Sequence, residues 1–195
     1  MTTSTTTTTT SIPGYVAGTW NIDPVHSDVS FTVRHMMVSK VRGRFGKFEG
    51  RIVTAPDVLD SSVTATIDLA SIDTNNPQRD AHIRSSDFFE VDAHPTMTFR
   101  STGIRPAEDG RFVLDGELTL RGITRPVSLD LELNGFGPDP YGNTRAGFSA
   151  TTELNRRDFG IDISMPLDGG GVVVGDRVNV SLEIEAVLDS AAAAE

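Results

Sequence analysis

Hydrophobic and polar residues alternate along most of this chain with a period of two. In the stretch from Asp28 to Met37, for example, Val29, Phe31 and Val33 share one face, and mostly polar residues lie between them. The same alternation recurs at Val63 to Leu69, Met97 to Phe99, Leu114 to Leu120, Val127 to Leu133 and Val178 to Ala186. Strands with one buried face have this period, so the pattern predicts a mostly antiparallel β domain of roughly eight strands.

Glycines interrupt the alternation where the chain is expected to turn or bend. Asp109-Gly110 lies between two alternating stretches, and glycine tolerates the positive φ that a tight hairpin turn requires. Gly43, Gly46 and Gly50 lie close to Phe45 and punctuate one predicted strand. Glycines in such positions allow a strand to bend sharply or bulge at the corner of a barrel.

Two short stretches are expected to be helical. Asn76-Pro77 combines a favoured N-cap residue with proline at the first helical position, so a short helix is predicted from Pro77 to about Arg84. Asp57 to Leu59 is a candidate for one further helical turn. On the longer helix Asp80 and Arg84 are four residues apart, and we expect them to form an ion pair on one face.

The number and spacing of the predicted strands fit either an antiparallel sandwich or a closed barrel. Several alternating stretches are about ten residues long, and the glycine bends indicate strong coiling. Both features favour a closed barrel, which has no exposed strand edges. An eight-stranded barrel is just wide enough to be filled by its own side chains or to hold one small ligand.

The 195-residue chain is expected to form one domain, at residues 15–189. Eight of the first ten residues are threonine, so residues 1–14 are predicted to be a disordered tail, as are residues 190–195. The start of the sequence lacks the features of a secretory signal, and no window approaches the ~18 apolar residues of a membrane span. We therefore expect a cytoplasmic protein with no integral membrane segment.

Charge and composition exclude several classes of function. With 17 basic and 27 acidic residues the net charge is −10, which repels phosphate backbones and anionic membrane surfaces, so nucleic acid is not expected as a partner. The chain has no cysteine, and its four histidines lack the spacing of a zinc site. No glycine-rich nucleotide motif is present. Neither a metal nor a cofactor is predicted.

The densest polar cluster runs from Arg79 to Asp87 and is followed at once by Phe88-Phe89. Its side chains either cap and pair along the predicted helix, or His82 and Arg84 lie over the mouth of a barrel and receive the polar end of an apolar ligand. The stretch from Arg156 to Gly160 has the same two interpretations, and a surface turn is favoured there.

Several of these stretches together carry a family resemblance. With Trp20-x-Ile22-Asp23-x-x-His26-Ser27 near its start and Asn155-Arg156-x-Asp158-Phe159-Gly160 near its end, the chain resembles the YceI-like family of bacterial, lipocalin-like proteins that bind polyisoprenoids. The resemblance covers about Gly18 to Leu188. It implies an all-β fold, an extended eight-stranded antiparallel β-barrel whose apolar pore holds an isoprenoid lipid such as a quinone or a prenyl diphosphate. It also implies a possible homodimer and no established catalysis.

The predicted ligand contacts are the inward positions of the strands and the residues at the mouth. They are Phe31, Val33, His35, Phe45, Phe99, Leu118, Leu120 and Phe148 in the wall, and His82, Arg84, Phe88 and Phe89 at the mouth. Each wall position also suits a packed core, because alternation indicates which face is buried and not whether the interior is filled.

The sequence is compatible with three functions. The favoured one is a binding or carrier protein for an isoprenoid-type lipid, which is not an enzyme. The second is a stress-responsive structural or interaction protein with a filled barrel. The third is an enzyme acting on a hydrophobic substrate, with Asp80, His82 and Arg84 as acid–base groups.

Overall fold

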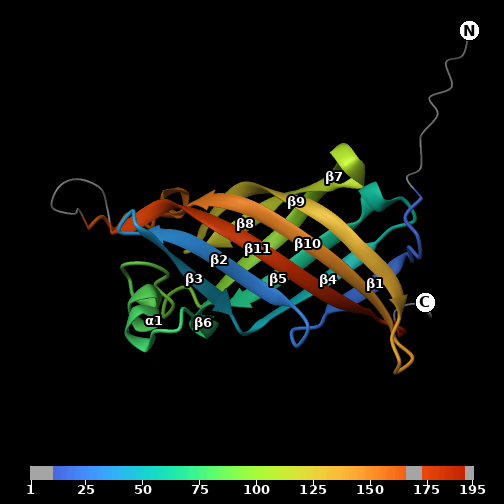
Figure 1. Ribbon diagram of the computed structural model, residues 1–195, viewed down its shortest axis with the longest axis horizontal. Coiled ribbons are helices and arrows are strands. Elements are labelled where there is room, and N and C mark those ends of the chain that lie inside the picture. The colour runs from blue at the N-terminus through green and yellow to red at the C-terminus, as the bar shows by residue number, and fades with distance from the viewer. Residues whose placement is uncertain (1–10, 166–172, 192–195) are drawn as a thin grey trace, which may run out of the picture.

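The computed structural model describes residues 11–165 and 173–191 and shows a β-barrel elongated along its strands (Figure 1). Around its wall lie, in order, β1 (Gly18–Ile22), β4 (Phe48–Thr54), β5 (Ser62–Asp68), β7 (Thr96–Pro106), β8 (Phe112–Leu120), β9 (Ile123–Pro138), β10 (Thr144–Asn155) and β11 (Val174–Leu188). Neighbouring strands are antiparallel, and β1 pairs with β11 to close the ring. The predicted eight-stranded antiparallel barrel is confirmed.

Three further strands lengthen the barrel at one end. They are β2 (Asp28–His35), β3 (Ser39–Phe45) and β6 (Ile72–Asp73). β2 pairs with the first part of β11, beyond the part that pairs with β1, so β1 and β2 occupy one position in the wall. β3 continues into β4 after a break at Gly46-Lys47, and β6 pairs with β3. The bend predicted near Gly46 is confirmed.

The alternation seen in the sequence corresponds to inward and outward side chains. In β8, Phe112, Leu114, Leu118 and Leu120 are all buried, whereas the residues between them are partly exposed. Gly116 occupies the remaining inward position of this strand. The period of two thus follows from the burial of one face of each strand.

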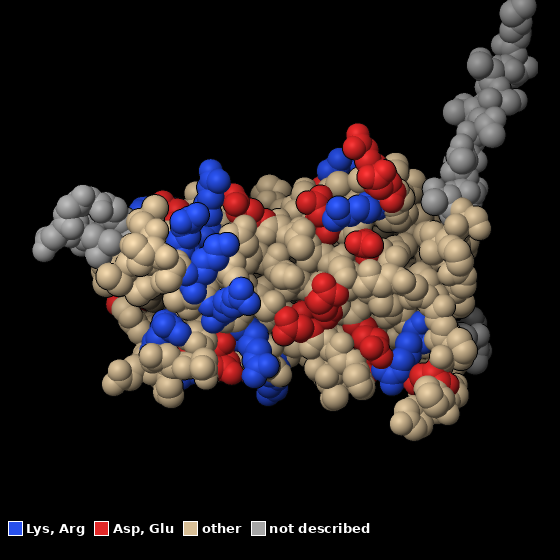
Figure 2. Space-filling model, in the orientation of Figure 1, with Lys and Arg blue, Asp and Glu red and all other residues tan. Residues whose placement is uncertain are grey.

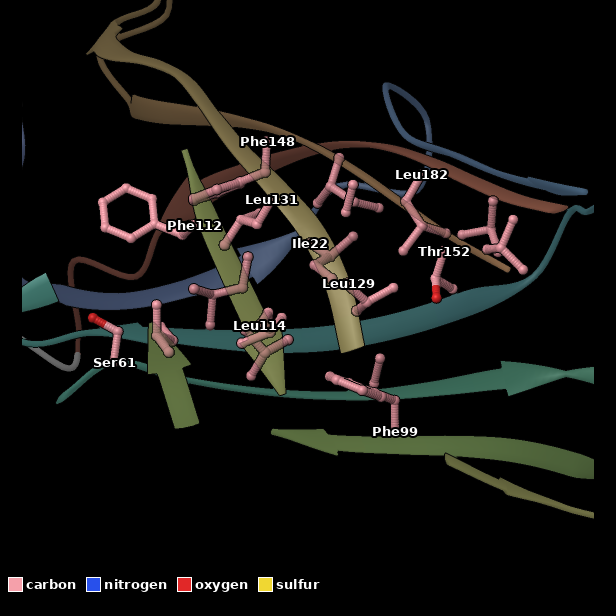
Figure 3. A pocket seen from close by; sticks show the side chains of 18 of the residues that line it. Ile22, Ser61, Phe99, Phe112, Leu114, Leu129, Leu131, Phe148, Thr152 and Leu182 are labelled. Atoms are coloured by element: carbon pink, nitrogen blue, oxygen red, sulfur yellow. The ribbon is translucent and has the colours of Figure 1, made fainter. Parts of the chain in front are cut away.

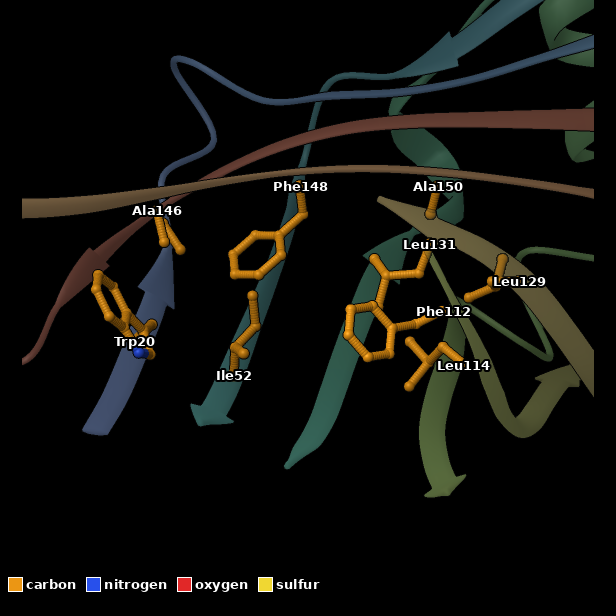
Figure 4. Packing of buried hydrophobic residues seen from close by; sticks show 10 residues of the cluster. Trp20, Ile52, Phe112, Leu114, Leu129, Leu131, Ala146, Phe148 and Ala150 are labelled. Carbon is orange, nitrogen blue, oxygen red and sulfur yellow. The ribbon is translucent and has the colours of Figure 1, made fainter. Parts of the chain in front are cut away.

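Two clusters of buried side chains lie along the interior, and β8 runs from one to the other. The first includes Trp20 and Phe148 (Figure 4). The indole N–H of Trp20 donates to Oγ1 of Thr54 over 2.8 Å, so its one polar atom is satisfied inside the core. The second cluster surrounds Leu69 and Phe159, which are almost fully buried.

The predicted helices are present. α1 (Pro77–Arg84) begins after Asn76, whose side chain accepts a hydrogen bond from the Arg79 N–H over 3.0 Å. A single 3₁₀ turn, η1 (Val58–Asp60), is capped in the same way by Asp57. Within residues 11–165 and 173–191, no helix has both the length and the apolar character needed to cross a bilayer.

The predicted ion pair between Asp80 and Arg84 is wrong. The Asp80 carboxylate is buried and accepts hydrogen bonds from the N–H and Oγ1 of Thr74, over 2.9 and 2.5 Å. The Arg84 guanidinium instead donates to the carbonyl of Ala70 over 3.3 Å. Spacing along a helix places two residues on one face, but contacts with neighbouring segments decide where their side chains bind.

Two turns show how far local sequence predicts backbone. Asp109 and Gly110 have φ of 57° and 73°, as expected for the tight hairpin between β7 and β8. The strand expected to run to Met37 instead ends at His35. Met36 and Met37 have φ of 50° and 60°, and the Val38 N–H donates to the His35 carbonyl over 3.2 Å.

Contacts with the barrel begin within residues 11–14, before residue 15, where the sequence predicts the domain to start. Ile12 packs against the cluster that contains Trp20, and the Tyr15 hydroxyl donates to the Ala55 carbonyl over 2.7 Å. A single apolar residue outside any alternating stretch carries no periodic signal, so the contact of Ile12 was not predictable from the pattern. Residues 1–10 and 192–195 of the predicted tails lie outside the described residues.

Candidate functional site

The first of two apolar cavities lies inside the ring of eight strands. Its volume is about 190 Å³. Side chains from several strands of the wall point into it (Figure 3). They include Phe99 on β7, Leu114 on β8, Leu129 on β9, Phe148 on β10 and Leu182 on β11. Polar residues such as Thr152 and Ser61 are a minority in this lining. We call this space the central cavity.

The second cavity lies at the end of the barrel that carries β2, β3 and α1. Its volume is about 270 Å³, and we call it the end cavity. The strands contribute Phe31 and Phe45 to its wall, while Phe88 and Phe89 line it from the segment that follows α1. The rings of Phe45 and Phe89 lie 6.1 Å apart between centroids. Aromatic side chains from the strands and from the segment after α1 thus face a ligand here.

The two cavities adjoin one another along the barrel. Val29, Met97, Leu154 and Val180 line both, so these four side chains form the partition between them. Each cavity is at least as large as a ~150 Å³ apolar cavity that can bind benzene. The interior is therefore neither packed solid nor a single open tube. It is an elongated apolar space divided by a thin layer of side chains, one of them a pliable methionine.

Most of the predicted contacts line one of these cavities. Those in the central cavity are Phe99, Leu118 and Phe148. Those in the end cavity are Phe31, Val33, His35, Phe45, His82, Phe88, Phe89 and Leu120. The exception is Arg84, which lines neither cavity and donates to the Ala70 carbonyl. Eleven of the twelve residues thus lie around adjoining spaces, which does not by itself show that they bind a ligand.

Residues Asp80, His82 and Arg84 do not meet at one point. His82 Nε2 lies 2.7 Å from Oδ2 of Asp87, and the other two side chains bind Thr74 and Ala70. A shared acid–base centre would require them to converge on one reacting atom. The arrangement of these three residues therefore does not favour the enzymatic hypothesis.

Arg156 belongs to the end cavity, although a surface turn was favoured for its segment. It is 5% exposed, and its guanidinium donates to the carbonyls of Ile161 and Gly175 over 2.7 and 3.1 Å. Burial lowers the pKa of this guanidinium, and an ion pair with Asp176 opposes that shift. The missed signal was the alternation of β10: Leu154 is the last inward residue of the strand, and Arg156, just beyond its end, continues the inward series.

Among the described residues, every ionisable side chain that lines the end cavity is basic. They are Arg34, His35, Arg79, His82 and Arg156. Arg79 is held by two hydrogen bonds to Thr74, with Nε–Oγ1 and Nη2–O distances of 2.8 and 2.6 Å. No Asp or Glu side chain among the described residues lines this cavity. A ligand with a negative or strongly hydrogen-bond-accepting head would therefore find donors at this end and apolar surface beyond it.

A cluster of possible metal-ligating groups lies at the opposite end of the barrel. It consists of Asp23, His26 and Glu185. The guanidinium of Arg145 lies among them, with Nη1 2.9 Å from Asp23 Oδ2 and 2.6 Å from Glu185 Oε1. Because Arg145 already neutralises these carboxylates, the group is better described as an ion-pair network than as a metal site.

Comparisons with known proteins give one family and one architecture. A family model described as the YceI-like domain matches residues 20–186. A UPF0312 protein of Vibrio cholerae serotype O1 is 41% identical over 139 residues, which is 71% of this chain and 74% of that protein. The crystal structure of Burkholderia cenocepacia BcnA superposes with a TM-score of 0.73 at 23% identity, covering 84% of this chain and 98% of BcnA.

A further solved structure has a name that refers to a ligand. It is a polyisoprenoid binding domain from Saccharophagus degradans, implicated in plant cell wall breakdown. It superposes with a TM-score of 0.67 at 16% identity and covers 89% of this chain and all of that domain. At this level of identity the likeness establishes a common fold.

Proposed function

Because the chain belongs to the YceI-like domain family, we propose that it is a binding or carrier protein for an isoprenoid-type lipid. The polyprenyl tail occupies the central cavity and passes the partition into the end cavity. The head, such as a quinone ring or a diphosphate, lies among the basic side chains near α1. The name of the Saccharophagus degradans domain supports this class of ligand.

The observation that carries the proposal is the unfilled apolar interior. Transfer of apolar groups from water contributes about 0.8 kcal/mol per CH₂, so each five-carbon unit contributes roughly 3 to 4 kcal/mol before costs. Three such units exceed the lower part of the ~4 to 15 kcal/mol range lost on association. A tail of three units therefore offsets most of the cost of association, a longer tail offsets more of it, and the head group adjusts specificity.

The partition sets how a long chain is accommodated. Met97 has several rotatable side-chain bonds and separates the cavities together with three aliphatic residues. A ligand longer than one cavity must displace the Met97 side chain, which costs the repacking of a few contacts. Chains that extend into both cavities bury more apolar surface, which offsets that cost.

A titration with prenyl alcohols of increasing length tests the proposal. Calorimetry on lipid-free protein should show affinity that rises from geraniol through farnesol to geranylgeraniol. Ala150→Phe places a ring in the central cavity. The affinity for the longest alcohol should then fall about tenfold or more, since this cavity is closed to its tail.

Thr151→Phe is the matched control for that variant. Thr151 neighbours Ala150 on β10 but is exposed on the outer face, so its substitution should leave the affinities unchanged. Absence of saturable binding for every alcohol would contradict the proposal. The cytoplasmic location and the homodimer expected from sequence remain predictions.

A further inference from the structure

The hairpin between β2 and β3 carries an exposed apolar tip beside the end cavity. Its three tip residues, Met36, Met37 and Val38, are 44%, 51% and 85% exposed. The residues at its base, including His35 and Val41, line the end cavity. An apolar group exposed at the edge of a ligand cavity needs a physical explanation, because solvent contact gives it no stabilisation.

The backbone of this tip is also unfavourable for its residues. Met36 and Met37 both have positive φ, where hairpin turns favour Asn and Gly. Side chains with a Cβ atom are disfavoured in this conformation. Local folding alone would therefore select different residues here, and departures of this kind concentrate at functional positions.

The two strands next to the tip, and the residues just after them, are rich in basic side chains. Residues 29–47 include Arg34, Lys40, Arg42, Arg44 and Lys47 and contain no Asp or Glu. Arg34 and Lys40 lie directly opposite each other across β2 and β3, an arrangement that is destabilising for like charges. Neither of these two, nor Arg42, forms an ion pair with another described residue. In Figure 2, Lys and Arg predominate over the half of the face where β2 and β3 lie.

We propose that the β2–β3 hairpin docks the barrel onto an anionic lipid bilayer, with its apolar tip in the interface and its basic residues against lipid head groups. Apolar groups flanked by Lys and Arg have this behaviour at membrane surfaces. The end cavity then faces the bilayer. Transfer of a lipid between membrane and cavity by this route rests on the proposed function, whereas the docking itself does not.

The net charge of −10 does not prevent this contact. Charges are screened beyond a Debye length of about 8 Å at physiological salt. β11 has 15 residues and extends from the hairpin to the opposite end of the barrel, which is roughly 50 Å at the rise of a strand. The acidic network around Arg145 lies at that distant end. Nearer the hairpin, Asp73 pairs with Arg44, Asp68 with Lys47, and Asp176 with Arg156 and Arg157, so these carboxylates are already neutralised. The charges that the hairpin itself presents to the bilayer are therefore those of Arg34, Lys40 and Arg42.

Vesicle co-sedimentation tests the proposal. The protein should bind vesicles of phosphatidylglycerol mixed with phosphatidylcholine, bind phosphatidylcholine alone much more weakly, and dissociate as salt is raised. Lys40→Glu with Arg42→Glu should lower binding at least about 25-fold, because each basic residue near the surface contributes about fivefold. Met36→Asn with Met37→Gly should lower vesicle binding about tenfold, while the hairpin remains at least as stable as in the unmodified protein.

Two controls separate this hairpin from general effects. Arg51→Glu with Arg111→Glu makes the same change in net charge on exposed residues toward the opposite end of the barrel and should leave binding unchanged. Tyr141→Ser removes another exposed apolar side chain, 86% exposed at the β9–β10 turn, and should also have no effect.

Several results would overturn the proposal. The first is that the unmodified protein does not sediment with the anionic vesicles. The second is that both hairpin variants bind the vesicles as well as the unmodified protein does. The third is that the control variants lose as much vesicle binding as the hairpin variants. A hairpin variant that changes a dimer to a monomer with vesicle binding intact would assign the tip to self-association instead. The prenyl alcohol titration on the same variants distinguishes the two proposals, because docking variants should retain ligand affinity.

Discussion

Two glycines allow aromatic rings to lie close to the barrel wall rather than across its interior. A Cβ atom at Gly43 would overlap the ring of Phe31, and one at Gly116 would overlap the ring of Phe99. Phe31 lines the end cavity and Phe99 the central cavity. Aromatic side chains that cover glycines on a neighbouring strand recur in curved sheets. Here the arrangement keeps both cavities open.

Gly43→Ala should narrow the end cavity. The new methyl group displaces the Phe31 ring toward the cavity, so the affinity for geranylgeraniol should fall about tenfold while the overall fold is retained, at a stability cost of roughly 1 to 3 kcal/mol. Calorimetry and thermal unfolding measure the two effects. Gly103→Ala is the control, since nothing lies within 4 Å of its added Cβ atom, and unchanged affinity in both variants would show that Phe31 does not limit the cavity.

Arg145 holds three carboxylates at the end of the barrel away from α1. Besides Asp23 and Glu185, it binds Asp139 over 2.7 Å, which ties together the β1–β2 turn, the β9–β10 turn and β11. Hydrogen bonds from His26 and Arg145 lower the pKa of Asp23 from 3.8 to about 2. The Arg145 guanidinium likewise lowers the pKa of Asp139.

Arg145→Met should destabilise the protein in a pH-dependent way. A carboxyl group with a lowered folded-state pKa stabilises the fold above pH 3.8, and that contribution is lost as pH falls toward 2. The variant should thus unfold several degrees lower than the parent at neutral pH, and the difference should shrink between pH 4 and 2. Fluorescence of Trp20, the single tryptophan, reports unfolding. A pH-independent difference, or one matched by the control Arg111→Met, would contradict this role.

The sequence predicted a residue's position correctly where alternation along a strand determines which way the side chain points. It failed where hydrogen-bond partners from other segments determine whether a polar side chain is buried. Alternation placed Phe148 and Phe99 inward, and both line the central cavity. The same alternation places Arg156 inward. A charged side chain beside a turn is usually exposed, however, and the carbonyl groups that accept its hydrogen bonds in the interior are known only from the structure. The partners of Asp80 were missed for the same reason, since Thr74 lies in a segment without a periodic signal.

At the scale of elements, the short helix α1 lines the end cavity, and the buried carboxylate of Asp80 attaches it to the rest of the fold. Asp80 binds the N–H and hydroxyl of Thr74, and Arg79 binds the same residue, so the helix is fastened to the chain that follows β6. The end cavity is lined by side chains from α1 itself and from the segment after it. Loss of this fastening should therefore affect both stability and the cavity.

Asp80→Ala should lower the free energy of unfolding by about 1 to 3 kcal/mol. The substitution leaves the buried N–H of Thr74 without its acceptor, which carries the full desolvation penalty of that group. Urea denaturation measures the change. Gln78→Ala lies on the exposed face of the same helix and should change the stability by less than about 0.5 kcal/mol. Equal effects of the two substitutions would show that the carboxylate does not anchor α1.

The elements themselves were largely predictable, and their ends less so. The N-cap at Asn76 and the Asp109-Gly110 turn carry specific chemical signals, and both are present. The β2–β3 turn was missed because methionine is not a turn residue, so Met36 and Met37 extend the apparent strand. That conflict between sequence and backbone is also the feature that draws attention to the hairpin.

At the scale of the whole molecule, the closure of the barrel could be predicted from its strands, but the two cavities inside it could not. The alternating stretches identify which side chains point inward, and eight strands set an approximate width. Whether those side chains fill the space depends on their summed volumes and on details such as Phe31 over Gly43. The partition formed around Met97 likewise follows only from three-dimensional packing.

The most direct measurement is native mass spectrometry of the protein purified from its host without delipidation. We predict a complex heavier than the polypeptide by the mass of one apolar molecule, which organic solvent extracts and which Ala150→Phe depletes relative to Thr151→Phe. Detection of the bare polypeptide alone, both as purified and after incubation with geranylgeraniol, would contradict the claim that this barrel holds a lipid.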